Sequence, residues 1–237
     1  MSEPIIGIEN LVFRWSAGVD PCLDIASFEV QAGERIFLHG PSGSGKSTLL
    51  GLFGGVLVPE RGRLNLLGVE LTKLSSAGRD RFRADHVGFI FQQFNLIPYL
   101  SVIDNVLLPC RFSAIRHARV QEGGRTPRSE AERLLSHLDL AAALHDRTAT
   151  QLSVGQQQRV AAARALIGQP ELVIADEPTS SLDAERQIAF LDLLSRECVE
   201  AGSALVFVSH DRRLAAGFSR EIDLPSINRC AAEGAPV

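Results

Sequence analysis

The sequence lacks any long hydrophobic run. Its most apolar stretches, such as residues 48 to 58, are short and interrupted by Gly and Pro. Since a helix needs about 20 apolar residues to cross a bilayer, the chain is not expected to span a membrane by itself. The first ten residues, MSEPIIGIEN, carry an early acid and lack both a basic start and a long apolar region, so a secretory signal is not expected there.

Cysteine is scarce, and positive charge is not in excess. The four cysteines form no CxxC pair and lie near no histidine cluster, which argues against a zinc site and a disulfide scaffold and agrees with a reducing cytoplasm. The 24 Lys and Arg are outnumbered by 28 Asp and Glu, and the net charge is -4. No general attraction for nucleic acid is therefore expected.

A glycine-rich motif stands out against this background. Residues 40 to 48 read GPSGSGKST and match the pattern G-x-x-x-x-G-K-[ST], between a short apolar strand at 35 to 38 and an apolar helix pattern after Lys46. Its backbone N–H groups can surround phosphate oxygens, Lys46 can reach the terminal phosphates, and the Ser47 hydroxyl can bind Mg²⁺. A flexible Gly/Ser linker would not end in GKST between a strand and a helix. The candidate nucleotide-binding residues are Gly40, Pro41, Ser42, Gly43, Ser44, Gly45, Lys46, Ser47 and Thr48.

Two acids follow a later apolar run. Residues 172 to 175 read LVIA, the pattern of a buried parallel strand, and Asp176, Glu177 and a proline come next. Ligands bind at this end of strands in open α/β sheets, so Asp176 suits a hold on Mg²⁺ and Glu177 suits activation of an attacking water. Alone, such a sequence would be a plain turn. Beside a phosphate loop, the functional interpretation is favoured.

The patterns elsewhere predict a helical block inserted into an α/β core. Between about 98 and 168 the chain is helix-rich, with a predicted capping box at Ser129 and Glu132. The basic segment 115 to 128 is predicted to be a solvated loop, the alternative being a contact with a partner or with anionic lipid headgroups. Further strands are predicted at residues 5 to 13, 22 to 30, 63 to 67, 86 to 91, 171 to 175 and 204 to 208.

Four segments together resemble the ATP-binding cassette ATPases of ABC transporters. LSVGQQQRVAAARAL is similar to the family signature, GFIFQQFN to its glutamine loop, LVIADEPTSSLD to its acidic strand and VFVSHD to its switch histidine, in the family's order and spacing. The resemblance implies an α/β fold: a P-loop NTPase core with a RecA-like, mostly parallel sheet, an N-terminal antiparallel β subdomain and an inserted α-helical subdomain. The implied core comprises residues 1 to 92 and 169 to 237, and the implied helical subdomain residues 93 to 168.

The resemblance also implies roles for single residues. Gln92 would sense the γ-phosphate through Mg²⁺ and the attacking water, and His210 would contact the γ-phosphate. Trp15 would stack on adenine, and Asp183 would cross a dimer interface. Alone, His210 would be a capping or satisfied histidine, and Trp15 a core or surface-cover residue. The residues implied to face a partner's ATP are Ser153, Gly155 and Gln156.

The implied assembly is a pair of cassettes that sandwich two ATP molecules, each bound by the phosphate loop of one subunit and the signature of the other. A homodimer is expected, with a heterodimer left open. A separate membrane permease would be the partner, which places the chain on the cytoplasmic face of the plasma membrane. GFIFQQFNLIPYLSVIDNVLLP most resembles the branch for lipoprotein release and for macrolide and peptide export, so a lipoprotein, peptide or drug-like cargo is expected.

Other interpretations stay open at this point. The apolar residues Phe94, Leu96, Ile97 and Pro98 either receive a permease helix or only pack the helical block. A soluble cassette acting on nucleic acid is one rival, which the missing heptad insertion and the missing basic excess disfavour. A regulator with slow turnover is another, suggested only by Val154.

Two features depart from the family pattern. Val154 replaces a glycine in the signature, and because a β-branched residue disfavours positive φ, either this position has an ordinary φ or the loop is shifted. We expect activity to survive, since Ser153 and Gly155 are retained. The tail from residue 220 is interrupted by Pro225 where family members often form a strand-turn-strand, and residues 231 to 237 are expected to be poorly ordered.

Overall fold

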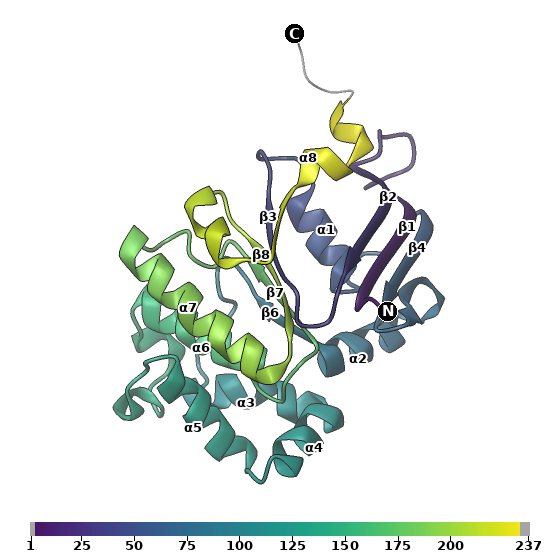
Figure 1. Ribbon diagram of the computed structural model, residues 1–237. Helices are drawn as coiled ribbons and strands as arrows, with labels where there is room; N and C mark the ends of the chain where they lie inside the picture. Colours follow the sequence, from purple (N-terminus) through teal and green to yellow (C-terminus); the bar gives the residue numbers. More distant parts are fainter. Residues whose placement is uncertain (1–2, 233–237) are drawn as a thin grey trace. The chain divides into compact units, whose positions relative to one another are not determined.

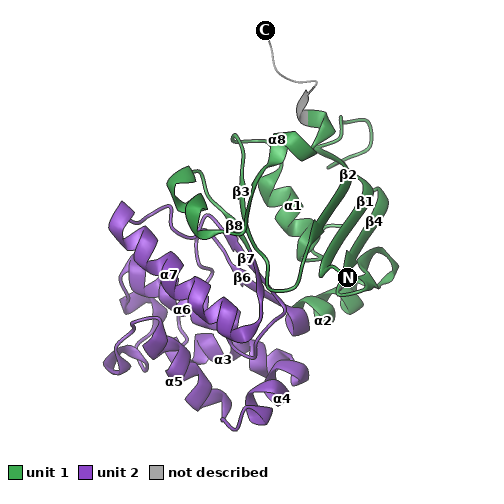
Figure 2. Ribbon diagram, viewed as in Figure 1, with its two compact units in different colours: residues 1–83, 206–237 green, residues 84–205 purple. Residues whose placement is uncertain are grey.

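The computed structural model describes residues 3–232 of the chain. The chain forms two compact units: unit 1 comprises residues 1–83 and 206–237, and unit 2 comprises residues 84–205 (Figure 2). The middle of the sequence thus forms one unit, and both ends of the chain belong to the other. The subdomain boundaries expected from the resemblance, at 92/93 and 168/169, follow the motifs and stay a prediction.

Unit 1 contains an antiparallel sheet with the strand order β2-β1-β4-β5 (Figure 1). Buried and solvent-facing side chains alternate along β2, so one face of this sheet packs against the core. Phe28 of β2 stacks on Phe53 of helix α1, with ring centroids 6.0 Å apart, which places α1 (Lys46–Phe53) against that face. The predicted strands of this region are confirmed as β1 (Ile6–Phe13), β2 (Leu23–Val30) and β4 (Arg61–Leu66), and the sheet also contains the short β5 (Val69–Glu70), which was not predicted.

A second group of strands in unit 1 carries the phosphate loop. β3 (Arg35–His39) pairs in parallel with β9 (Arg220–Asp223), from Ile36 opposite Arg220 to His39 opposite Asp223. On its other side lies β8 (Ala204–Val208), whose last three residues belong to unit 1. Phe37 stacks on Phe207 at 6.3 Å between centroids. β8 and the central residues of β3 are continuous buried apolar runs, as expected for a parallel sheet covered on both faces, whereas β9 at the end of the strand order alternates half-buried and exposed residues.

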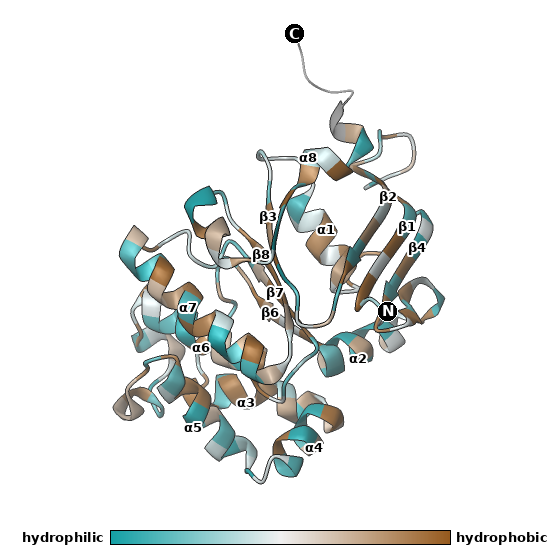
Figure 3. Cartoon of the chain, viewed as in Figure 1, coloured by the Kyte–Doolittle hydropathy of each residue, from teal (hydrophilic) through white to brown (hydrophobic). Residues whose placement is uncertain are grey.

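Unit 2 combines two parallel strands with a set of helices. β6 (Val87–Ile90) pairs with β7 (Leu172–Asp176), and Ile90 lies opposite Ala175. In Figure 3, apolar and polar residues alternate along α7, the pattern of a helix that buries one face. Helix α2 (Ser76–His86) leads into this unit, and its other helices are α3 (Val102–Phe112), α4 (Ala114–Glu122), α5 (Pro127–His137), α6 (Val154–Leu166) and α7 (Ala184–Ala201).

Helix α5 begins earlier than predicted, so the capping box at Ser129 and Glu132 is wrong. Thr126 is the N-cap: its hydroxyl accepts a hydrogen bond from the Ser129 N–H at 3.1 Å, and its own N–H donates to the Ser129 hydroxyl at 3.0 Å. The reason is Pro127, which favours the first helical turn because it has no N–H to leave unpaired. Glu132 instead pairs with Arg128 at 3.0 Å.

The basic segment 115–128 is not the solvated loop that its composition predicts. Helix α4 covers most of it, and Arg116 is only 1% exposed. The Arg116 guanidinium donates to the carbonyl oxygens of Ala165 (3.2 Å) and Ile167 (3.1 Å) at the end of α6, and burial lowers its pKa to about 10. The side chain is buried because it satisfies carbonyls that the helix itself leaves unpaired.

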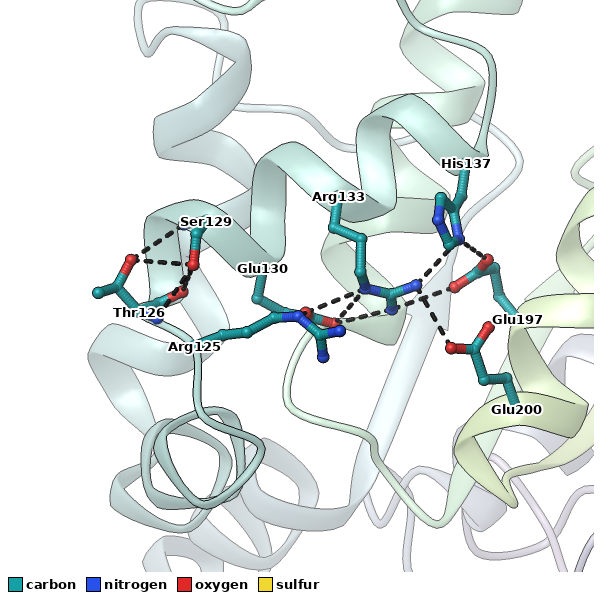
Figure 4. Close-up of polar contacts among 8 residues, drawn as sticks. All are labelled: Arg125, Thr126, Ser129, Glu130, Arg133, His137, Glu197 and Glu200. Carbon is teal, nitrogen blue, oxygen red and sulfur yellow. Dashed lines mark hydrogen bonds and ion pairs between the residues drawn. The ribbon is translucent and has the colours of Figure 1, made fainter.

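An ion-pair network joins α5 to α7 inside unit 2 (Figure 4). Arg133 contacts Glu130 at 2.8 Å, Glu197 at 3.3 Å and Glu200 at 3.6 Å, and His137 contacts Glu197 at 2.8 Å. The Glu130 and Glu197 side chains are each only 7% exposed. The guanidinium therefore supplies the charge that two buried carboxylates require.

The C-terminal segment forms β9, then helix α8 (Leu224–Ile227), then a 3-10 helix at Arg229–Ala232. Pro225 lies in the first turn of α8, so the interruption expected at this residue is a change from strand to helix. Of the segment 231–237, expected to be poorly ordered, residues 233–237 lie outside the described residues. In the part of the chain that the structure describes, every helix is too short or too polar to cross a membrane.

Candidate nucleotide-binding site

The phosphate loop of unit 1 joins the end of β3 to the first turn of α1. Its three glycines, Gly40, Gly43 and Gly45, all have positive φ. Gly45 is the N-cap of α1 with φ 99°, and a Cβ atom there would lie 2.8 Å from Leu23 Cδ2. A residue with a side chain is thus excluded twice, by backbone conformation and by space.

Two side chains of the loop are placed for an anion. Lys46 is 8% exposed, and its Nζ donates to the carbonyl oxygens of Gly40 (2.9 Å) and Pro41 (3.0 Å), which leaves one of its three N–H groups for a further acceptor. The Ser44 hydroxyl is buried and has no hydrogen-bond partner among residues 3–232. An orphaned donor beside a lysine at a helix N-terminus fits phosphate oxygens.

Trp15 and His210 are the other predicted site residues of unit 1. Trp15 follows β1, is 64% exposed, and meets Phe13 edge to face at 5.2 Å between centroids. Because most of its side chain is exposed, Trp15 is not a core residue, and its ring is accessible for stacking. His210 follows β8 by two residues and is exposed.

Gln92 and the acidic pair lie at one edge of the parallel strands of unit 2. Asp176 is the last residue of β7, and Gln92 comes two residues after β6. Because Ile90 is in register with Ala175, Gln92 and Glu177 continue from adjacent strand ends. The carboxyl ends of these strands thus present an amide and two carboxylates at the same edge.

Glu177 has a left-handed backbone conformation, with φ 46°. For a residue with a side chain this conformation costs on the order of 1–2 kcal/mol, so the surrounding structure has to hold it. Gln158 of α6 donates to the Pro178 carbonyl at 3.0 Å, and Gln187 of α7 donates to the Thr179 carbonyl at 3.1 Å. Side chains from two helices therefore hold the turn at Pro178 and Thr179, which sets the orientation of Glu177.

Gln158 was not predicted as a site residue. It is 1% exposed, and the signal for it was a polar residue three and four positions before Ala161 and Ala162, on the helix face that these buried alanines share. The sequence alone does not identify the backbone carbonyl, 20 residues away, that this side chain binds.

The predicted signature residues begin helix α6. Ser153 is the N-cap in a capping box with Gln156: the Gln156 N–H donates to the Ser153 hydroxyl at 3.4 Å, and the Ser153 N–H donates to Gln156 Oε1 at 2.9 Å. Val154 is the first helical residue, its φ is not positive, and it is 49% exposed. Of the two alternatives for Val154, the ordinary φ is confirmed.

Gly155 and Asp183 are the remaining predicted site residues of unit 2. At Gly155, Leu182 Cδ2 at 3.9 Å is the one atom of the described residues that an added Cβ would meet within 4 Å, so the backbone there is open to a ligand. Asp183 is the N-cap of α7 and accepts from the Arg186 N–H at 3.0 Å, with its side chain 58% exposed.

Among the apolar residues that follow Gln92, Phe94 is 6% exposed and therefore packs inside unit 2, whereas Pro98 is exposed.

The structure thus brings the predicted residues together in two groups. Unit 1 holds the phosphate loop together with Trp15 and His210. Unit 2 holds two sets, the strand-end residues and the signature residues: Gln92, Asp176, Glu177, Ser153, Gly155, Gln156 and Asp183.

Comparisons with known proteins agree with this arrangement. Residues 23–180 match the family model described as ABC transporter. The chain is 38% identical to the lipoprotein-releasing system ATP-binding protein LolD 2 of Caulobacter vibrioides, over 94% of this chain and 96% of that protein. It is also 38% identical to the macrolide export ATP-binding/permease protein MacB of Rhodopirellula baltica, over 82% of this chain but only 28% of that longer protein.

A solved structure has the same fold. The ATP-binding cassette MJ0796, solved as a dimer in a post-hydrolysis state bound to ADP and Pi, matches with a TM-score of 0.80 and 34% identity, over 92% of this chain and 93% of that one. The predicted α/β fold class is confirmed. With the family model covering most of the chain and relatives matching along nearly its whole length, the chain belongs to the ABC transporter family as an ATP-binding cassette ATPase.

Proposed function

We propose that this chain is the engine subunit of a transporter: two cassettes close on ATP, hydrolyse it, and thereby drive a conformational change in a separate membrane permease. The observation that carries the proposal is the strained, clamped Glu177 at the carboxyl end of β7, in a chain that also holds a phosphate loop with an unpartnered hydroxyl. ATP makes contacts to both subunits that ADP does not make, and these contacts shift the equilibrium between open and closed dimers toward the closed one.

In this proposal the phosphate loop binds the triphosphate. Its N–H groups and the helix N-terminus favour the anion, Lys46 supplies a charge-assisted hydrogen bond, and the Ser44 hydroxyl gains the acceptor it lacks. Trp15 stacks on adenine with its exposed ring. Ser153, Gly155 and Gln156 of the partner copy complete the pocket, and Asp183 lies at the interface.

The hydrolytic step falls to unit 2 and to His210. Glu177 orients the attacking water and accepts its proton, Gln92 positions that water, and His210 contacts the γ-phosphate. Ser47, Gln92 and Asp176 offer hydroxyl, amide and carboxylate oxygens, the donor set that Mg²⁺ prefers. When bound, Mg²⁺ neutralises phosphate charge.

The likeness to the LolD protein over 94% of this chain supports a lipoprotein as cargo, with a peptide or a drug-like molecule as the other candidates. A pair of identical subunits is proposed, by analogy with the dimeric solved cassette. The chain then works at the cytoplasmic face of the membrane, bound to its permease.

The test is the variant Glu177→Gln. It keeps the size of the side chain and removes the proton acceptor, so we expect ATP turnover to fall by about a hundredfold or more while ATP binding persists. With ATP, the variant should elute at the mass of a dimer in size-exclusion chromatography. Glu122→Gln, on an exposed glutamate at the end of α4, is the matched control and should behave as wild type. Full turnover by Glu177→Gln would remove Glu177 from the hydrolytic role.

A further inference from the structure

The C-terminal segment of the chain contacts the phosphate loop through one buried side chain. Asn228 is 3% exposed. Its Oδ1 accepts hydrogen bonds from the backbone N–H groups of Asp24 (2.9 Å) and Cys230 (3.3 Å). Its Nδ2 donates to the carbonyl oxygens of Cys22 (3.0 Å) and, in a longer contact, Ser44 (3.5 Å). All four hydrogen-bonding directions of this amide are used, and one of them ends on the loop.

Helix α8 also lies close to the start of the loop. A Cβ atom at Gly40 would be 3.1 Å from Pro225 Cδ and 3.5 Å from Leu224 Cβ. The first of these distances is tighter than ordinary van der Waals contact and Gly40 has φ 154°, so a residue with a side chain would strain the packing of the loop against α8. Leu224 is fully buried, which anchors the helix at this point.

The start of β2 supports the loop as well. A Cβ atom at Gly45 would lie 2.8 Å from Leu23 Cδ2 and 3.4 Å from Cys22 Sγ, so Cys22 and Leu23 border the loop. Asn228 binds the carbonyl of that same Cys22 and the N–H of Asp24. It therefore ties together the two segments that border the loop, the start of β2 and the chain that follows α8.

The contact to Ser44 has a consequence for the ligand. The peptide bond between Ser44 and Gly45 is planar and trans, so its C=O and its N–H point in opposite directions. When Asn228 holds the Ser44 carbonyl oxygen, it also fixes where the Gly45 N–H points. That N–H is one of the amides of the loop that a bound phosphate needs as donors.

We propose that Asn228 is a positioning residue for nucleotide binding: it orients the Ser44–Gly45 peptide and fastens the C-terminal segment to the phosphate loop. The proposal rests on the proposed ATP-binding function and extends it to a part of the chain that carries no recognised motif. Asn228 does not touch the nucleotide. It lowers the cost of ordering the loop around it, so its effect falls on binding rather than on the chemical step.

Two variants remove the donor in different ways. Asn228→Asp keeps an acceptor for the Asp24 and Cys230 N–H groups but places an oxygen opposite the Ser44 and Cys22 carbonyls. Asn228→Leu removes the donor without adding charge, which separates loss of the hydrogen bond from repulsion of the triphosphate. Ser226→Ala is the matched control, since the exposed Ser226 hydroxyl, within residues 3–232, donates only to the Asp223 carbonyl, at 2.7 Å. Each protein is assayed for steady-state ATP hydrolysis and for the rise of Tm that ATP produces.

We expect both Asn228 variants to raise KM for ATP by about three- to tenfold, the range that the net worth of one hydrogen bond predicts, with kcat within about twofold of wild type. The ATP-induced rise of Tm should shrink in both, and Ser226→Ala should match wild type. An unchanged KM in Asn228→Leu, whether or not its Tm without ATP falls, would overturn the proposal. A wild-type protein that neither hydrolyses ATP nor gains Tm from it would instead refute the proposed function.

Discussion

At the scale of the residue, Val154 is the departure from the family pattern whose effect the structure makes easiest to assess. It occupies the first position of α6 with an ordinary φ and a half-exposed side chain, while its neighbour Ser153 caps the helix. Because φ is not positive at this position, the backbone conformation does not require glycine there. The valine is thus compatible with the same loop geometry as the residue it replaces.

We therefore predict that Val154→Gly leaves steady-state ATP hydrolysis within about twofold of wild type, since no positive φ is relieved. Glycine in a helix costs up to about 1 kcal/mol, so Tm should fall by a few degrees at most. ATPase assays and thermal unfolding of the two proteins check this. If the glycine variant hydrolysed ATP many times faster, or if only that variant formed a dimer with ATP, activity would not survive the valine as expected.

At the scale of the element, the packing of α5 on α7 depends on Arg133. Removing its charge would take away the guanidinium that the buried carboxylates of Glu130 and Glu197 share, and would leave them only Arg125 at 3.5 Å and His137 at 2.8 Å, respectively (Figure 4). We predict that Arg133→Met lowers the free energy of unfolding by about 3 kcal/mol, measured with urea. Arg128→Ala on the same helix is the control, because its exposed pair with Glu132 is worth well under about 1 kcal/mol. Equal losses in the two variants would contradict this account of the network.

Elements also show where prediction from sequence stops. Strands and the helix of the phosphate loop follow from apolar runs and glycine, and these predictions hold to within a residue or two. Helix α4 was missed because its basic residues are typical of solvated loops. What fixes it is the fit of Arg116 to two carbonyls about 50 residues further along the chain, and no local pattern contains that information.

At the scale of the whole molecule, acid should unfold the protein partly through Glu171. Burial raises the pKa of this carboxyl, but hydrogen bonds from His86 and Arg119 outweigh burial and lower the pKa from its ordinary 4.5 to about 2. A lowered pKa means stability that is fully present above about pH 4.5 and is lost as pH falls through 2.

The variant Glu171→Gln tests this pH dependence. We predict a loss of about 1–3 kcal/mol of unfolding free energy at pH 7, after allowance for partial solvent screening. The difference between wild type and variant should shrink as the pH is lowered from 4.5 toward 2. Denaturant unfolding across this range measures it, and a difference that stayed constant with pH would show that the charge of Glu171 does not contribute.

The candidate site was predictable in so far as its residues stand in local motifs. The phosphate loop, the acidic strand and the signature are each a short run, and the structure gives each the strand end or helix start that its pattern indicates. Asn228 was not predictable, because its partners Cys22 and Ser44 lie 206 and 184 residues away. Supports of this kind appear only once the chain is folded.

One helix makes two connections with a shared consequence. The first turn of α6 carries the signature residues, and one turn later its Gln158 holds the carbonyl that follows Glu177. In the proposed dimer, the signature residues of a subunit contact the ATP bound to its partner, whereas Glu177 acts on the ATP bound to its own subunit. A small shift of α6 when its signature residues contact the partner's ATP would therefore move Gln158 with the helix, and so would change the position of Glu177. The occupancy of each nucleotide site would then affect the other site, so ATP hydrolysis at the two sites would be coupled, whether it is simultaneous or alternating.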